Sequence, residues 1–412
     1  MTRTWTLNVI LLLVALIAKT ALATPSEQVL YSFGSDRYPG GVIFDSHGNL
    51  YGVCSAGGQY GYGSVFELSP SSDGWTETVL YSFTGGLDGG SPGETQSLVF
   101  DNSGNLYGTT VRGGTTGYGT VFKLTPSIGG NWTETVIHSF LDRPGGYPEV
   151  GLVFDAAGNL YGTTFAGNGT IFEMSPQPSG GWKYRILHIF QYRITEDGSG
   201  PLVALTFDAA GNLYGTTYIG GTLNCGYGQN GCGTVFKLTS TSGGGWHYRQ
   251  IYRFQGASDG ERPYGSVVIT AAGDVYGTTN LGGNGQCYSN VPGCGTVFKL
   301  SPNSDGSYAH SVIYTFAGTP TDGGSPQGGL VLDPAGNLFG TTFQGGTING
   351  GTVFGLAPDS SGWQETVLHS FGHGTDGQEP SAEPIMDSSG NIYGTTYTGG
   401  ANGLGAVFEL TP

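Results

Sequence analysis

The sequence is poor in charged residues, and beyond its N-terminal segment it has no amphipathic helical period. Asp, Glu, Lys and Arg make up only 11% of the 412 residues, whereas an average soluble domain has about 25%. This scarcity argues against a charge-rich disordered chain, and 24 Tyr and 21 Phe favour a packed interior. Because aromatic residues and glycine abound and helix-forming runs are missing, we expect an all-β fold.

Positive charge is scarcer still, since 14 Lys and Arg stand against 30 Asp and Glu, a formal net charge of −16. Loss of Arg3 and Lys19 with the N-terminal segment would take this to −18. Nucleic acid and anionic membranes are therefore poor partners. Most of the other basic residues fall in one stretch, either as solvated outer-strand side chains or as a basic sector for an acidic partner: Lys183, Arg185, Arg193, Lys237, Arg249, Arg253 and Arg262.

Long hydrophobic runs are missing except between Leu7 and Ala18. That run follows Arg3 and precedes the small-residue cleavage pattern Ala21-Leu22-Ala23, so we interpret residues 1–23 as a secretory signal peptide. The alternative, an uncleaved anchor, would need a run of about 20 residues. We expect a mature chain of residues 24–412 that is secreted or periplasmic.

The catalytic motifs H-E-x-x-H and the P-loop are also missing. The five cysteines instead suit an exported protein. Two pairs have the same spacing in consecutive repeats and predict the disulfides Cys225–Cys232 and Cys287–Cys294, with zinc as the weaker alternative. Cys54 is left over and is expected to be a buried free thiol.

Glycine is plentiful, at 78 residues, and much of it belongs to one repeated phrase. "GNLYGTT" stands at 104–110, 158–164 and 211–217, and four close variants bring the number to seven. Each unit of about 55 residues holds four short β-type runs, which in the second unit are 97–101, 105–110, 119–126 and 132–140. This pattern predicts a seven-bladed β-propeller of four-stranded antiparallel blades in one domain, 24–412. A β-helix is the alternative fold.

The two ends of the chain complete each other. Residues 27–33 resemble the fourth run of a unit, whereas the last unit stops after its third run at 406–412. We therefore expect the N-terminal strand to pair with the C-terminal repeat and close the ring. Within the phrase, the Gly after Tyr is expected to let an aromatic side chain of the adjoining blade approach the backbone, and the Thr pair suits a half-buried strand.

The full unit, "P-x-x-GLVFD-x-x-GNLYGTT…GTVFKLTP…W-x-ETVLYSF", resembles the tandem repeat of bacterial secreted proteins known as GloVer-containing or choice-of-anchor repeat proteins. The similarity covers nearly all of residues 27–412. It implies an exported bacterial protein, often tethered by a C-terminal sorting signal, but neither an activity nor site residues. No sorting signal follows Pro412, so we expect release or periplasmic residence. A looser similarity to NHL-type propellers supports the fold alone.

Loop variation indicates where a ligand would bind. The loops between the second and third strands, and between blades, share one face and hold every large variation, so we expect binding on that face. The candidate ligand-binding residues are Tyr60, Tyr62, Arg112, Tyr118, Arg193 and Arg262. A wider set of residues that break the repeat adds Arg143, Glu196, Glu261 and Glu379.

An acid recurs in the loops between blades, usually as Asp-Gly. These acids either form turns or bind calcium near the channel mouth: Asp88, Asp197, Asp259, Asp322 and Asp376. The Trp that begins most fourth strands is either a sugar platform or, as we favour, a packing residue.

Two classes of function stay open. The first is a non-enzymatic binding or scaffold propeller, expected to be monomeric, whose ligand is an extracellular carbohydrate or another surface polymer. The second is a propeller enzyme, a hydrolase or lyase acting on a polysaccharide, ester or lactone with a cation at the channel mouth.

Overall fold

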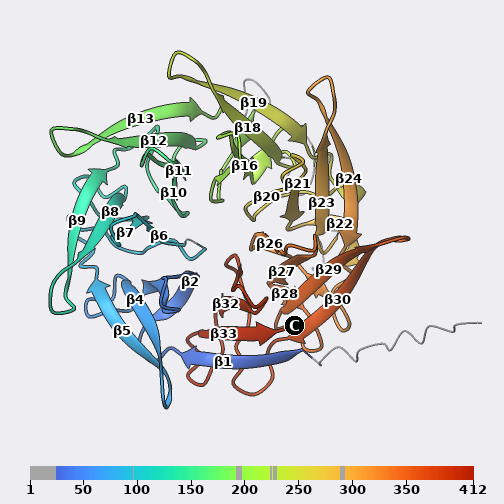
Figure 1. Ribbon diagram of the computed structural model, residues 1–412. Coiled ribbons are helices and arrows are strands. Elements are labelled where there is room, and N and C mark those ends of the chain that lie inside the picture. The colour runs from blue at the N-terminus through green and yellow to red at the C-terminus, as the bar shows by residue number, and fades with distance from the viewer. Residues whose placement is uncertain (1–24, 96, 192–196, 223–224, 226–229, 288–292) are drawn as a thin grey trace, which may run out of the picture.

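Seven four-stranded antiparallel sheets surround a central axis in the computed structural model of the protein (Figure 1). The structure describes residues 25–95, 97–191, 197–222, 225, 230–287 and 293–412. The all-β, seven-bladed prediction is confirmed. The signal peptide predicted at 1–23 lies outside the described residues. Within them no helix is long and apolar enough to span a membrane.

Each blade runs from an inner strand at the axis to an outer strand at the rim (Figure 1). Blade 1 is β2 (Arg37–Phe44), β3 (Leu50–Ala56), β4 (Ser64–Ser71) and β5 (Gly74–Ser82). Blade 2 is β6 (Val99–Phe100), β7 (Leu106–Thr110), β8 (Thr120–Pro126) and β9 (Trp132–Ser139). Blade 3 is β10 (Val153–Phe154), β11 (Leu160–Thr164), β12 (Thr170–Pro176) and β13 (Trp182–Ile189).

The remaining blades follow the same order. Blade 4 is β15 (Thr206–Phe207), β16 (Leu213–Thr217), β18 (Thr234–Ser240) and β19 (Trp246–Arg253). Blade 5 is β20 (Val268–Ile269), β21 (Val275–Thr279), β23 (Thr296–Pro302) and β24 (Tyr308–Thr315). Blade 6 is β26 (Leu330–Leu332), β27 (Leu338–Thr342), β29 (Thr352–Asp359) and β30 (Gly362–Ser370). Short pieces in the loops are β14 (Gly198–Ser199), β17 (Ile219–Gly220), η1 (Ala257–Asp259), β22 (Gly282–Gln286), β25 (Gly323–Gly324) and β28 (Gln344–Gly345).

Blade 7 joins the two ends of the chain, as predicted. It consists of β31 (Ile385–Met386), β32 (Ile392–Thr396), β33 (Ala406–Thr411) and β1 (Ser26–Ser32). β1 is antiparallel to β33 and pairs with it from Ser26↔Thr411 to Ser32↔Ala406. The ring is therefore closed by backbone hydrogen bonds between the first and last strands.

The repeated phrase forms the second strand of each blade, and its small residues fit close contacts. A Cβ on Gly108 would lie 2.6 Å from Cζ of Phe122. Phe122 is opposite Gly108 on β8 of the same blade, which corrects the expected partner: the aromatic comes from the neighbouring strand and not from the adjoining blade. The hydroxyl of Thr110 lies 2.8 Å from that of Thr120, and Thr109 donates to the carbonyl of Pro148 in blade 3. Both Thr side chains are buried.

Blades are joined by aromatic contacts across their interfaces. Trp132 of blade 2 meets Tyr51 of blade 1 edge to face, and Trp182 meets Tyr107 in the same way. Trp246 and Trp363 repeat the arrangement with Tyr161 and Tyr276. These tryptophans serve packing, the interpretation that we favoured.

Candidate binding site at the channel mouth

Each blade begins next to the axis with a residue followed by proline. We call the residue before this proline the entry position. Its φ lies between 51° and 65° in all seven blades, which is the left-handed region. Six of the seven residues are not glycine, and such residues rarely adopt this region. The carbonyl of Ser91, for example, accepts the N–H of Val111, which directly follows the phrase. The entry positions are Tyr38, Ser91, Tyr147, Gly200, Arg262, Ser325 and Glu379.

We call the residue that follows each repeated phrase the exit position. Entry and exit positions lie together on the face where the chain leaves the second strand and enters the first, which is the face that loop variation predicted. The exit positions are Ser55, Val111, Phe165, Tyr218, Asn280, Phe343 and Tyr397.

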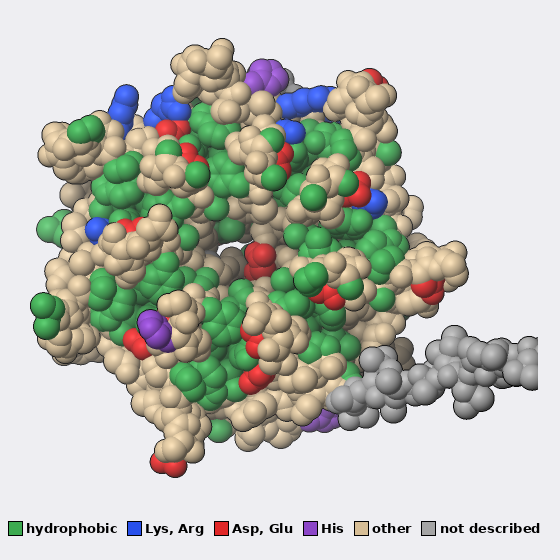
Figure 2. Space-filling model, in the orientation of Figure 1, with side chains coloured by type: hydrophobic (Ala, Val, Ile, Leu, Met, Phe, Trp, Pro, Cys, Tyr) green, Lys and Arg blue, Asp and Glu red, His purple; other side chains and the backbone are tan. Residues whose placement is uncertain are grey.

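A cavity of about 580 Å³ opens among these positions at the mouth of the central channel. Tyr38, Phe343 and Tyr397 supply aromatic walls, and the rings of Tyr38 and Tyr397 stack 4.4 Å apart. In blades 3 to 7 the residue directly after the entry proline also lines the cavity: Glu149, Leu202, Tyr264, Gln327 and Ser381. An opening along the axis is visible in the space-filling view, with acidic side chains beside it (Figure 2).

Two glutamates give the cavity a negative wall. Burial raises the pKa of Glu149, and the nearby Glu94 carboxylate raises it further. Burial and these two carboxylates also raise the pKa of Tyr264 to about 12. Tyr397 has its pKa raised to about 12 by burial, by Glu94 and by Tyr38. The tyrosines therefore keep their hydroxyl protons at neutral pH and can donate hydrogen bonds to a ligand.

The floor of the cavity is a constriction of about 80 Å³ in the channel. Here the Ser266 hydroxyl of blade 5 donates to the Glu383 carboxylate of blade 7. Gly329 of blade 6 leaves room for this contact, because a Cβ there would lie 2.3 Å from Oγ of Ser266. The exposed part of Glu383 faces the channel, and burial raises its pKa.

The predicted ligand-binding residues are spread over the face. Arg112 lines the cavity, and Arg262 occupies an entry position, where its Nη1 donates to the Tyr218 hydroxyl over 2.9 Å. The Tyr118 ring lies 5.2 Å from that of the entry residue Tyr147. Tyr60, which is 52% exposed, lines a separate hollow near Asp36. Tyr62, 48% exposed, covers Gly85, and Arg193 lies outside the described residues.

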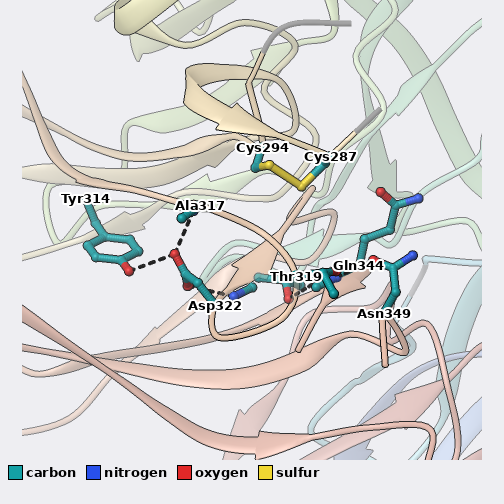
Figure 3. Close-up of a disulfide and its surroundings, with 11 residues drawn as sticks. Cys287, Cys294, Tyr314, Ala317, Thr319, Asp322, Gln344 and Asn349 are labelled. Atoms are coloured by element: carbon teal, nitrogen blue, oxygen red, sulfur yellow. Dashed lines mark hydrogen bonds between the residues drawn. A yellow bond between two sulfur atoms is a disulfide. The ribbon is translucent and has the colours of Figure 1, made fainter. Parts of the chain in front are cut away.

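The aspartates between blades hold their own loops together. Asp322 accepts hydrogen bonds from the Tyr314 hydroxyl, 2.9 Å, and from the backbone N–H of Ala317, 2.6 Å (Figure 3). Asp197 accepts from Tyr248 of the next blade over 2.7 Å, and Asp88, Asp259 and Asp376 have similar partners within their blades. The structure does not gather these five acids, and within the described residues no group of three acidic, His or Cys side chains could share a metal.

Arg185, Lys237 and Arg249 of the basic stretch have partners inside the protein. Arg185 and Arg249 each donate a hydrogen bond of 2.9 Å to a turn carbonyl of the next blade, Gly244 and Gly306 respectively. Lys237 lies 3.8 Å from the Asp208 carboxylate. Arg185 and Arg249 therefore link neighbouring blades, whereas Lys237 contacts an acid of its own blade.

Both predicted disulfides are present, and Cys54 is free and buried, as expected. Each disulfide lies in the loop between the second and third strands, and one is shown in Figure 3. Glycines of the next loop pass beside the sulfurs: a Cβ on Gly256 would lie 2.9 Å from Sγ of Cys232. Each disulfide thus joins two points of a long loop on the face of the entry and exit positions.

The repeat identifies the relatives of this protein. The Gloeobacter/Verrucomicrobia repeat family matches residues 16–227 and 285–412, well over half of the chain. The chain belongs to this family. Membership in the Gloeobacter/Verrucomicrobia repeat family confirms the tandem-repeat resemblance found in the sequence. None of the curated protein sequences compared with the chain matches it.

Solved structures of low sequence identity share the architecture. A streptogramin B lyase has a TM-score of 0.55 at 13% identity, with 94% of this chain and 97% of that chain covered. A proposed 6-phosphogluconolactonase from Bacteroides uniformis has a TM-score of 0.50 at 13% identity, covering 80% and 83%. The extracellular domain of a proposed hybrid two-component system from B. thetaiotaomicron has 0.52 at 10% identity, covering 92% and 39%. At these identities the likeness shows the fold alone.

Sequence reasoning missed Glu149 and Tyr264, which line the cavity, and Glu383, which lines its floor. Glu149 and Tyr264 directly follow an entry proline, and Glu383 comes three residues after another. The repeated proline was visible in the sequence and could have marked these inner positions.

Proposed function

We propose that the protein is an exported, non-enzymatic binding propeller that takes a carbohydrate or another extracellular polymer at its channel mouth. The cavity of about 580 Å³ carries this proposal, because aromatic walls face glutamates and tyrosine hydroxyls within it. Aromatic rings pack on the apolar face of a sugar, and carboxylates accept hydrogen bonds from its hydroxyls. The match of the family and the two disulfides support an extracellular setting.

A glycan array probed with purified residues 24–412, in calcium and again in EDTA, tests this function. We expect saturable binding to a related set of glycans, weakened about tenfold by Y397A and E149Q. Y60A is the discriminating variant, because Tyr60 lines a separate hollow. If Y60A weakens binding and Y397A does not, the ligand binds at the loop rim and not in the cavity. If no glycan on the array binds, the proposed function is contradicted.

The buried acids of the channel favour a second candidate, a hydrolase or lyase acting on a polysaccharide, ester or lactone. Burial raises the pKa of both Glu149 and Glu383, which suits a carboxyl that gives up a proton during a reaction. Turnover of such substrates is measured with and without added divalent cations. Catalysis would be favoured if E383Q abolishes the turnover but leaves ligand binding intact. Binding without turnover on any of them would contradict it.

A further inference from the structure

Four exit residues are aromatic, and Phe343 is followed at the next entry position by Glu379, which carries neither a ring nor a guanidinium group. The contacts of the other three, Phe165, Tyr218 and Tyr397, can be compared. Tyr397 is covered by the stacked ring of Tyr38. The ring of Tyr218 is covered by the guanidinium of Arg262, 5.1 Å from its centroid. In both cases a planar side chain from the following blade lies on an aromatic ring.

The third case differs. The exit residue of blade 3 is Phe165, and the entry residue of blade 4 is Gly200, the one glycine among the seven entry positions. A Cβ on Gly200 would lie 3.3 Å from Cε2 of Phe165, so any side chain there would begin in contact with the ring. The Phe165 side chain is 42% exposed, and Tyr218 and Tyr397 are each less exposed than this.

We propose that the uncovered ring of Phe165, with Gly200 beside it, is a second sugar subsite. It rests on the proposed function and would take the apolar face of one pyranose ring of a longer saccharide. In the two covered cases a flat group lies on the face of the exit ring, so we expect the exposed face of Phe165 to accept a flat group as well. Gly200 has no side chain that could cover the Phe165 ring, so a ligand can occupy the place that the entry side chain takes in the other two cases.

The position of Phe165 relative to the cavity determines the kind of ligand. Exit residues Ser55, Val111, Phe343 and Tyr397 line the cavity, and Phe165 follows Val111 in blade order on the same face. A saccharide of several units can reach both places, whereas a monosaccharide held in the cavity cannot. The subsite therefore contributes to binding of oligosaccharides and not of their single units.

Two variants test the subsite from opposite directions. F165L keeps apolar volume but removes the flat ring, and we expect it to weaken oligosaccharide binding about tenfold. G200Y places a ring on Phe165 and should weaken it similarly. G200Y is expected to fold, because Tyr38 and Tyr147 occupy the equivalent position with φ of 59° and 57°.

F165Y is the matched control, since it keeps the flat ring at the same exposed position. Calorimetry on the best array ligand and on its monosaccharide, with thermal unfolding of each variant, gives the result. If Y397A weakens both ligands while F165L and G200Y weaken neither, the subsite is overturned and the proposed function stands. If F165Y weakens binding as much as F165L, the effect does not depend on the flat ring and the subsite is also overturned. If the wild-type protein binds no saccharide, both proposals fail together.

Discussion

Individual residues of the repeated phrase are fixed by contacts inside their own blade. Gly108 faces the ring of Phe122 and a methyl group of Leu98, with a Cβ position 2.6 and 2.8 Å from them. The second Thr of the phrase meets a Thr of the third strand, so two buried hydroxyls satisfy each other. The contact between the glycine and a phenylalanine recurs in all seven blades and the Thr pair in blades 2 to 6, so the repeated phrase follows from a repeated environment.

Replacing Gly108 by alanine should destabilise the protein by about 1–3 kcal/mol, because the added methyl overlaps Phe122 and must displace it. Chemical denaturation of G108A would measure this. The matched control is G243A, since a Cβ on Gly243 meets no atom within 4 Å. Equal stability of the two variants would contradict the contact.

The same residues show the limits of prediction from sequence at this scale. The glycine was expected to meet an aromatic residue, but the register that puts Phe122 opposite it appears only once the strands are paired. The left-handed entry positions could not be predicted from composition, since Tyr, Ser, Arg and Glu are not residues that signal a positive φ. Glu383 occurs once, in a segment that differs from its six counterparts, so no repetition drew attention to it.

At the scale of strands, the outer parts of the blade interfaces contain acids that face one another. Glu134 on β9 lies near Asp88 of blade 1, and burial together with that carboxylate raises the pKa of Glu134 to about 7. Glu365 beside Asp322 and Glu27 beside Asp376 reach about 7 for the same reasons. One oxygen of each of these glutamates is buried without a hydrogen-bond partner. Protonation of the glutamate removes the repulsion between the paired acids.

These glutamates should make the protein less stable above neutral pH. Their pKa in the folded protein lies above the ordinary 4.5, so their contribution is complete below about 4.5 and is lost as pH rises through about 7. We expect the melting temperature to fall between pH 6 and pH 8, moderately because the groups are only partly buried.

The variant E27Q/E134Q/E365Q should melt at nearly the same temperature at pH 6 and pH 8. D73N, in the exposed turn between β4 and β5, serves as a control for net charge and should retain the wild-type slope. A triple variant with an unchanged slope would exclude the glutamates as its cause.

The whole molecule is held as a ring by the pairing of β1 with β33. Seven units with a missing strand at one end and an extra strand at the other were enough to predict this closure from the sequence. The cavity could not be predicted in the same way, because its walls come from the inner segments of several blades and depend on the diameter of the ring.

Deleting residues 25–33 should lower the melting temperature by more than 10 °C, since a whole strand and its hydrogen bonds are lost and β33 becomes an exposed edge. Light scattering should show oligomers formed through that edge. A synthetic peptide of residues 25–33, added in trans, should restore both properties, whereas a scrambled peptide should not. A monomeric deletion variant of unchanged melting temperature would show that closure contributes little.

Closure between the first and last strands also sets when the protein can finish folding. Ser26 finds its partner Thr411 only after the final strand has been synthesised, so every shorter product of the ribosome carries an unpaired strand. Such a chain stays open and is easily kept extended by chaperones or degraded by proteases. A product that stops before β33 therefore differs from the closed ring by free strand edges on β1 and β32.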